Sequence, residues 1–427
     1  MIARIGRFAK QSSLLWAAEV GGVGLRLVTI ALLGRFYGPE ILGTYLSIVA
    51  LAQLLPRILD LGLPLAIGYF VRVYPDRLAS CMRISALHVL ISTPFAMGLA
   101  ALLMLVPFEA GNATEVVDRI WWVLGIYVVA ELSCSLARAA FIPRMQFGAY
   151  MSVMLVPLVL LAAAVTLHEV AFPGTVLGPA TLIELLTASS VIAALLAGGI
   201  VLHTVKRGEQ LQLDGGDMYR YGSRTYVSGL AKVASQRFDR IFLTMLLGAS
   251  AFAQYSVALS LREMIIFPAN LLALTLRNQQ IDLVAHKRDV ARARRLLLRV
   301  SAIAAGAATA IATLLAPVWG FIVPLIFGDG FSGAAHFITV LAFSCPFLAI
   351  VSFAWNHLYA MKRPGRVTIL TCVSLVLAAP TFAIAVTLFG RADGAAVAAV
   401  IWAAMVAVGS FVWAWRTTPL TPAGGQI

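Results

Sequence analysis

Long apolar stretches separated by short polar breaks dominate this sequence. A helix that crosses the hydrocarbon core of a bilayer needs about 20 consecutive, mostly apolar residues. Stretches of that length recur from residues 13–34 near the amino end to residues 392–415 near the carboxyl end. Because 61% of the residues are hydrophobic and only 12% are charged, most of the helix surface cannot face water. The sequence therefore predicts an all-α polytopic membrane protein, with the lipid bilayer as its solvent.

The spacing of the stretches predicts about twelve membrane-spanning helices. The expected spans are residues 12–34, 41–71, 84–107, 120–142, 150–168, 179–203, 222–247, 251–276, 297–317, 335–360, 367–389 and 392–415. The apolar stretch 319–327 is shorter than a bilayer requires. We interpret it as an extracytoplasmic loop or a re-entrant segment.

The basic residues give these helices an expected orientation. Most of the Lys and Arg residues that lie in polar breaks fall on alternate breaks, starting with the amino terminus, and the opposite breaks hold only Arg35, Arg119 and Arg391. Cytoplasmic loops are enriched in Lys and Arg, so both termini are expected in the cytoplasm. The densest basic run, residues 286–299, fits a topogenic cytoplasmic loop better than a contact for anionic lipid or nucleic acid. We expect no nucleic-acid partner.

The chain shows signs of two similar halves. Gly38 is followed seven residues later by Tyr45, and Gly248 is followed seven residues later by Tyr255. Each of these segments opens the second helix of its half after a very short turn. Six helices in each half would give both halves the same orientation. We predict two pseudo-symmetric six-helix lobes around a central cavity, an N-terminal lobe over residues 1–208 and a C-terminal lobe over residues 209–427.

Charged residues inside the predicted spans concentrate on the first two helices of each half. An ionisable group at membrane depth normally faces a partner or a water-filled cavity, because an unpaired charge in lipid is costly. The cations of this set are Arg26, Arg57, Lys232, Arg237, Arg240 and Arg262. The acids are Glu19, Asp60, Asp239 and Glu263.

Two interpretations of this set stay open: structural ion pairs between helices, or a polar cavity with a positive excess. Such a cavity suits an anionic ligand, since guanidinium groups bind phosphate oxygens bidentately. The acids could neutralise the empty cavity or bind a coupling proton or sodium ion. We predict that the six cations bind substrate and that the four acids act in coupling or gating. Neither catalytic residues nor metal ligands are expected.

Proline and glycine interrupt the helices that carry these charges. Pro56, Gly62 and Pro64 flank Arg57 and Asp60, and Pro268 lies in the corresponding helix of the second half. Paired interruptions of corresponding helices favour a binding site, because freed backbone groups can line a cavity.

The opening of each half resembles the corresponding segment of a known family. Residues 32–45 read LLGRFYGPEILGTY, and residues 60–64 read DLGLP. This opening resembles that of bacterial polysaccharide transporters, the O-antigen and exopolysaccharide repeat-unit flippases. In the second half, Asp239 followed by LLG and then by QYS at residues 254–256 is similar to the pattern that opens their carboxy-terminal lobe.

The resemblance implies translocation of an undecaprenyl-diphosphate-linked oligosaccharide from the cytoplasmic to the periplasmic leaflet of the bacterial inner membrane by alternating access. It implies no cofactor, leaves coupling to a proton or sodium gradient open, and suggests polysaccharide polymerase and chain-length proteins as partners. A multidrug and toxin extrusion antiporter is the nearest alternative function. A membrane enzyme of the same pathway is less favoured, since the sequence has no G-x-x-x-x-G-K-[ST] run and no H-E-x-x-H pair. A passive scaffold is also less favoured, since it gives the costly buried arginines no role.

Overall fold

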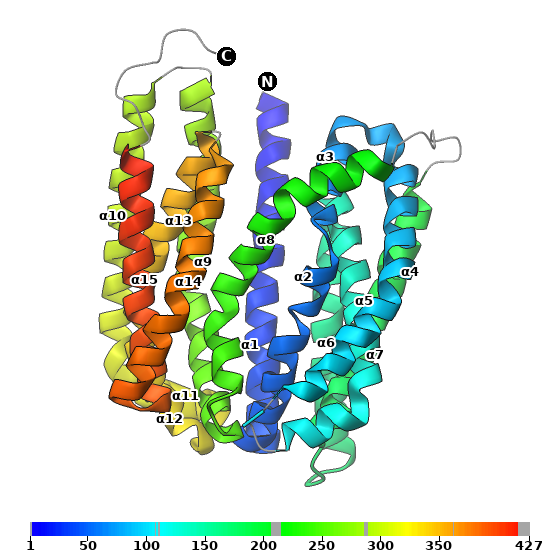
Figure 1. Ribbon diagram of the computed structural model, residues 1–427, viewed down its shortest axis with the longest axis vertical. Coiled ribbons are helices and arrows are strands. Elements are labelled where there is room, and N and C mark those ends of the chain that lie inside the picture. Colours follow the sequence, from blue (N-terminus) through cyan, green and yellow to red (C-terminus); the bar gives the residue numbers. More distant parts are fainter. Residues whose placement is uncertain are drawn as a thin grey trace. The chain divides into compact units, whose positions relative to one another are not determined.

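The computed structural model describes residues 2–106, 108–109, 112–205, 215–285, 289–361 and 363–416. These residues form α-helices and short 3-10 helices joined by tight turns (Figure 1). In chain order the elements are α1 (Ile2–Ala52), α2 (Leu55–Leu59), α3 (Leu63–Val73), η1 (Pro75–Arg77), α4 (Leu78–Leu102), η2 (Leu103–Leu105), α5 (Ala113–Phe141), α6 (Phe147–Ala171), α7 (Pro179–Thr204), α8 (Gly215–Thr244), α9 (Ala249–Ala285), α10 (Val290–Leu315), η3 (Ala316–Val318), α11 (Trp319–Phe327), η4 (Asp329–Phe331), α12 (Ser332–Ala342), α13 (Cys345–Ala360), α14 (Pro364–Phe389) and α15 (Arg391–Arg416).

The chain divides into two compact units. Unit 1 comprises Met1–Val233 and Thr244–Ala253, and unit 2 comprises Ala234–Leu243 and Gln254–Ile427. Helix α8 contributes its amino-terminal part to unit 1 and most of its carboxy-terminal part to unit 2. The predicted lobe boundary after residue 208 lies outside the described residues.

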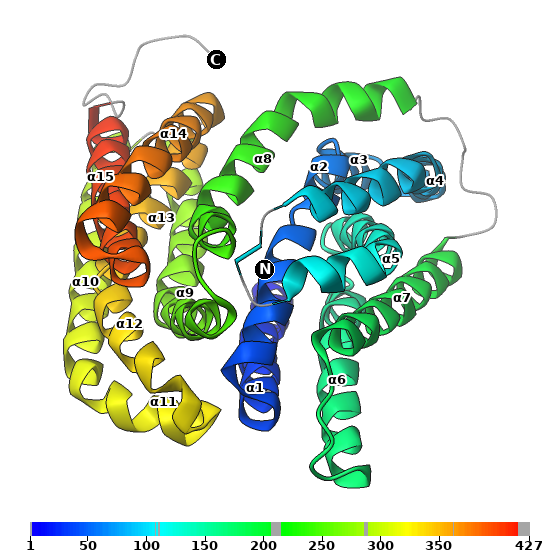
Figure 2. The same ribbon diagram turned by 60° about the horizontal axis from the view of Figure 1, so that its bottom comes forward.

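Within unit 1, α5 packs between α4 and α7, while α6 packs against α7 and α1 (Figure 2). Small buried residues, among them Cys134 and Ala137 of α5 and Ala193 and Ala197 of α7, line the contacts near α6. Small side chains let helix backbones approach closely. In lipid, where apolar surfaces gain little from leaving the solvent, this close packing drives helices to associate. These contacts hold α5 at the centre of the bundle.

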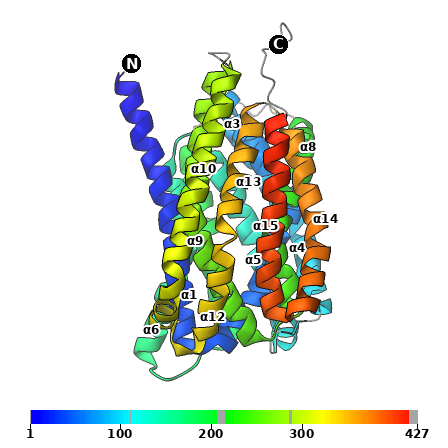
Figure 3. The same cartoon turned by 90° about the vertical axis from the view of Figure 1, so that its left-hand side faces the viewer.

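Within unit 2, α13 packs against α10 and α15, and α15 packs against α14 (Figure 3). The face of α15 turned inward is a run of alanines, which includes Ala395, Ala399, Ala403 and Ala407. Ala407 lies in one buried cluster with the larger side chains Phe353 and Trp355 of α13. The outward positions carry exposed apolar side chains, for example Val408 and Val412, as expected for a helix in lipid.

By length and composition, nine helical segments among the described residues qualify as candidate membrane spans, or ten if the bent pair Asp329–Ala342 and Cys345–Ala360 is one span. The fold is therefore that of an all-α polytopic membrane protein, as predicted. Each of the twelve expected spans overlaps described helices. The first two merge into one candidate, Glu19–Leu59, and α8 is too polar to qualify. The number twelve stays a prediction.

The backbone breaks where the sequence predicts interruptions in the first half. Gly38 has φ 78° and ψ 175°, which interrupts α1 between its two helical parts. A second break follows α2, where Leu61 and Gly62 both have positive φ. Pro56 and Pro64 lie in the first turns of α2 and α3, where no backbone N–H is needed.

Two local expectations are wrong. Pro268 does not interrupt its helix, because α9 continues from Ala249 to Ala285. Proline removes one backbone hydrogen bond, and a helix held by its neighbours in a membrane protein tolerates that loss. The stretch expected as a loop or re-entrant segment is instead the helix α11, and with α10 and η3 it forms one candidate span, Val290–Phe327.

Candidate functional site

Two ion pairs connect α8 and α9 within unit 2. Arg262 Nη2 lies 3.6 Å from Asp239 Oδ2, and Arg240 Nη2 donates a hydrogen bond to Glu263 Oε1 at 2.6 Å. Two adjacent residues of α8 thus meet two adjacent residues of α9. The first pair is deeply buried, with side-chain exposures of 7% for Asp239 and 11% for Arg262, whereas Glu263 is 42% exposed.

The surroundings of Arg262 contain polar groups without partners. Among the described residues, the Nε of Arg262 and the hydroxyl of Tyr255 are buried without a hydrogen-bond partner. Tyr255 lies within electrostatic range of Asp239 and Arg262. On the far side, Cys345 Sγ of α13 donates to the Arg262 carbonyl oxygen at 3.8 Å. Buried donors of this kind are normally satisfied by water or by a bound polar group.

A third ion pair lies at the break after α2 in unit 1. Arg57 Nη1 lies 3.5 Å from Asp60 Oδ2 and 3.4 Å from Ser135 Oγ of α5. The other carboxylate oxygen of Asp60 accepts a hydrogen bond from the Gly62 N–H at 2.8 Å, which stabilises the left-handed turn. The side chain of Arg57 is 41% exposed. The protein therefore does not fully enclose the Arg57 side chain in this pair.

The carbonyl groups freed at the end of α2 receive hydrogen bonds from α4 and α8. The ring Nε2 of His88 lies 2.8 Å from the Leu59 carbonyl oxygen, and its Nδ1 lies 3.1 Å from the Tyr219 hydroxyl. The Tyr226 hydroxyl donates to the Ile58 carbonyl oxygen at 2.7 Å. A helix end leaves its last carbonyls without intrahelical partners, so the break creates acceptors for these side chains. The sequence reasoning missed all three residues.

The remaining predicted residues lie on α1 and α8. Tyr150 of α6 donates to Glu19 Oε1 of α1 at 2.6 Å, a contact that the sequence reasoning also missed. Arg26, seven residues further along α1, is exposed. Lys232 and Arg237 are half-buried on α8.

The structure thus brings three predicted cations into contact with three predicted acids. Arg57, Arg240 and Arg262 each pair with an acid that was assigned a different role. The residues predicted to bind substrate and those predicted to act in coupling are therefore in direct contact at these three pairs. The roles themselves stay predictions.

The fold is similar to that of known transporters. An inward-facing multidrug resistance MATE family transporter of the MOP superfamily matches with a TM-score of 0.74 at 15% identity, over 92% of this chain and 93% of that chain. The lipid II flippase MurJ in an inward closed conformation matches with a TM-score of 0.74 at 12% identity, over 95% of this chain and 88% of that chain. These likenesses show that the fold is similar to that of these two transporters.

A comparison with protein-family models identifies the family of this chain. The model of the polysaccharide biosynthesis protein family matches residues 8–274, which is more than half of the chain. The chain therefore belongs to the polysaccharide biosynthesis protein family, as the two sequence segments suggested. A search of curated protein sequences gives no match.

A third solved structure has a similar fold. It is a MOP superfamily transporter from Pyrococcus furiosus, with a TM-score of 0.60 at 14% identity over 96% of this chain and 92% of that chain.

Proposed function

We propose that this protein is a flippase that moves an undecaprenyl-diphosphate-linked oligosaccharide, a polysaccharide or O-antigen repeat unit, from the cytoplasmic to the periplasmic leaflet. The family match over residues 8–274 carries the proposal, because it connects a transporter fold with polysaccharide biosynthesis. The lipid II flippase MurJ has a similar fold and supports the idea of a lipid-linked substrate. The proposal also places the protein in a bacterial inner membrane, with twelve spans and with both termini in the cytoplasm.

The chemistry of the substrate fits the charged residues. Sugar hydroxyls and a diphosphate cannot cross hydrocarbon without compensation for lost hydrogen bonds and charge solvation. A polar path through the protein would shelter these groups while the lipid tail stays in the bilayer. Guanidinium groups such as those of Arg57 and Arg240 bind phosphate oxygens strongly. Moving an anion outward is also favoured by an inside-negative potential, by about 2.3 kcal/mol per charge per 100 mV.

The ion pairs suggest how substrate and a coupling ion could exclude each other. In the empty protein, Asp60, Glu263 and Asp239 neutralise Arg57, Arg240 and Arg262. A diphosphate that binds an arginine displaces its carboxylate, and a proton or sodium ion then neutralises the freed carboxylate. Such competition would link substrate occupancy to ion occupancy through differential affinity.

Neutral replacement of three predicted cations tests this assignment. Arg26→Gln, Arg57→Gln and Arg237→Gln are each expected to reduce surface polysaccharide in a complemented deletion strain at least about tenfold, because each loses a charge-assisted contact to phosphate. Membrane levels of the protein should stay unchanged. Arg119→Gln, which removes an exposed arginine of α5 outside the predicted set, is the matched control. Full polysaccharide production by all three variants would contradict the cationic site.

A further inference from the structure

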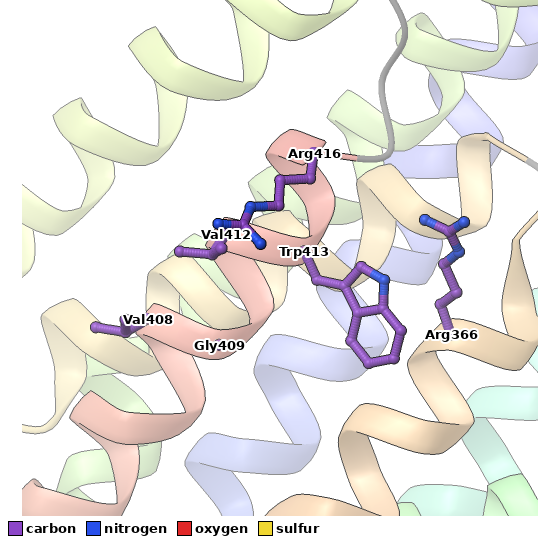
Figure 4. Close-up of a pocket in the computed structure, with 6 residues that line it drawn as sticks. All are labelled: Arg366, Val408, Gly409, Val412, Trp413 and Arg416. Atoms are coloured by element: carbon purple, nitrogen blue, oxygen red, sulfur yellow. The ribbon is translucent and has the colours of Figure 1, made fainter.

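A groove of about 620 Å³ lies between α14 and α15 of unit 2. Its lining residues are Arg366, Val408, Gly409, Val412, Trp413 and Arg416 (Figure 4). None of them belongs to the charged set predicted for transport. The groove is therefore a separate feature of unit 2.

One part of the groove is apolar and open. Val408 is 64% exposed, Val412 is also exposed, and both belong to the candidate span Arg391–Arg416. Gly409 leaves room beside them, because a Cβ atom at this position would meet nothing within 4 Å. A bundle helix normally fills such a position with a side chain. The groove therefore has an open apolar surface along α15 at Val408, Gly409 and Val412.

The other part of the groove is cationic. Arg366 lies in the first turn of α14, and Arg416 lies in the last turn of α15. The indole of Trp413 extends from α15 toward the side chain of Arg366 (Figure 4), and its inner side packs on the core of unit 2. Tryptophan is typical of the level where lipid headgroups meet the hydrocarbon. The two arginines and the indole therefore mark a headgroup position.

Further positive charge gathers at the same end of unit 2. The guanidinium of Arg294, near the start of α10, lies 3.1 Å from the centre of the Trp415 ring. This contact brings the basic first turns of α10 to the end of α15. The acid Asp289 is engaged there as the cap of α10, where it accepts a hydrogen bond from the Arg292 N–H at 2.8 Å. The distribution of Lys and Arg assigns this end to the cytoplasmic side, where anionic lipids attract basic residues.

We propose that this groove binds an anionic phospholipid of the surrounding bilayer. Arg366 and Arg416 attract the headgroup phosphate from opposite sides of Trp413 (Figure 4), and an acyl chain runs along Val408 and Val412 over Gly409. The charge of the site selects anionic headgroups, because phosphatidylglycerol brings a net negative charge to the two guanidinium groups, whereas the choline of phosphatidylcholine cancels the charge of its phosphate. The inference does not depend on the proposed function, since the site lies outside the residues assigned to transport.

Native mass spectrometry of the full-length purified protein tests the site with phosphatidylglycerol as the probe. The double variant Arg366→Gln with Arg416→Gln is expected to raise the Kd for phosphatidylglycerol at least tenfold. Gly409→Phe should produce a similar loss, because the ring covers the open apolar surface along α15. Its matched control is Gly306→Phe on α10, another helical glycine where a Cβ would meet nothing within 4 Å. The matched control for the arginines is Arg391→Gln, at the opposite end of α15.

Several outcomes would overturn the proposal. One is unchanged phosphatidylglycerol binding by both groove variants while each keeps the parent elution volume in size exclusion. Equal binding of phosphatidylcholine would remove the selectivity for anionic headgroups. Displacement of phosphatidylglycerol by equimolar inorganic phosphate would show a phosphate site that does not need a lipid. Displacement by equimolar undecaprenyl phosphate would assign the groove to the substrate lipid instead.

Discussion

Replacing Asp239 by asparagine is expected to destabilise the protein by about 3 kcal/mol, because it leaves Arg262 buried without a counter-charge. The pair is the most buried of the three in the charged set, with side-chain exposures of 7% and 11%. Coulomb attraction in such a site offsets the loss of hydration only while both charges are present. The measurement is unfolding of the protein in mixed micelles, followed by tryptophan fluorescence. The same variant should abolish polysaccharide production.

The neighbouring pair supplies the control for this prediction. Glu263→Gln removes the partner of Arg240 on the same two helices, but Glu263 is 42% exposed, so water in the proposed polar path would screen its charge. We expect a loss below about 1 kcal/mol. Replacing both members of the buried pair, Asp239→Leu with Arg262→Met, should cost less than Asp239→Asn alone, since no charge is then left uncompensated. Equal stability of Asp239→Asn and the parent protein would show that Arg262 is solvated.

Gly43→Ala is expected to lower the stability of unit 1 by about 2–3 kcal/mol through overpacking. A Cβ atom at Gly43 would lie 1.8 Å from the carbonyl oxygen of Ala249, the first residue of α9. Backbone atoms of two helices meet at this point, so no change of rotamer relieves the clash. The helices must move apart, which exposes packed surface on both. Thermal unfolding of the purified protein measures the loss.

Gly24→Ala on the same helix is the matched control. A Cβ at Gly24 would meet nothing within 4 Å, and alanine is the better helix former by roughly 0.5–1 kcal/mol. The control variant should therefore match or exceed the parent in stability. If both variants behave alike, the close contact between α1 and Ala249 does not contribute to the fold.

The sequence predicts the helical architecture well because the solvent imposes it. A chain in lipid must satisfy its backbone within helices or closed barrels, so apolar stretches alone locate the helices. The short turn at residues 36–40 and the break after Asp60 were also predictable, since glycine and proline mark both. Arg57 and Asp60 meet because they are three residues apart.

Contacts between helices that are distant in the sequence could not be predicted from residue spacing. Glu19 and Tyr150 are separated by 131 residues, and their hydrogen bond depends on how α1 packs against α6. His88 reaches the Leu59 carbonyl only because the chain breaks after α2 and frees that group. Nor does residue spacing reveal that Asp239 and Arg262 face each other, since the length of the turn between α8 and α9 sets their register.

Transport of a lipid-linked oligosaccharide by the purified protein tests the central claim most directly. The assay uses proteoliposomes with a fluorescent undecaprenyl-diphosphate oligosaccharide in the inner leaflet and measures its appearance in the outer leaflet, with and without a proton or sodium gradient. The proposed function predicts transfer that is faster than in protein-free vesicles and that is lost in Arg57→Gln. Transfer equal to that in empty vesicles under every gradient, by protein that unfolds cooperatively, would contradict it.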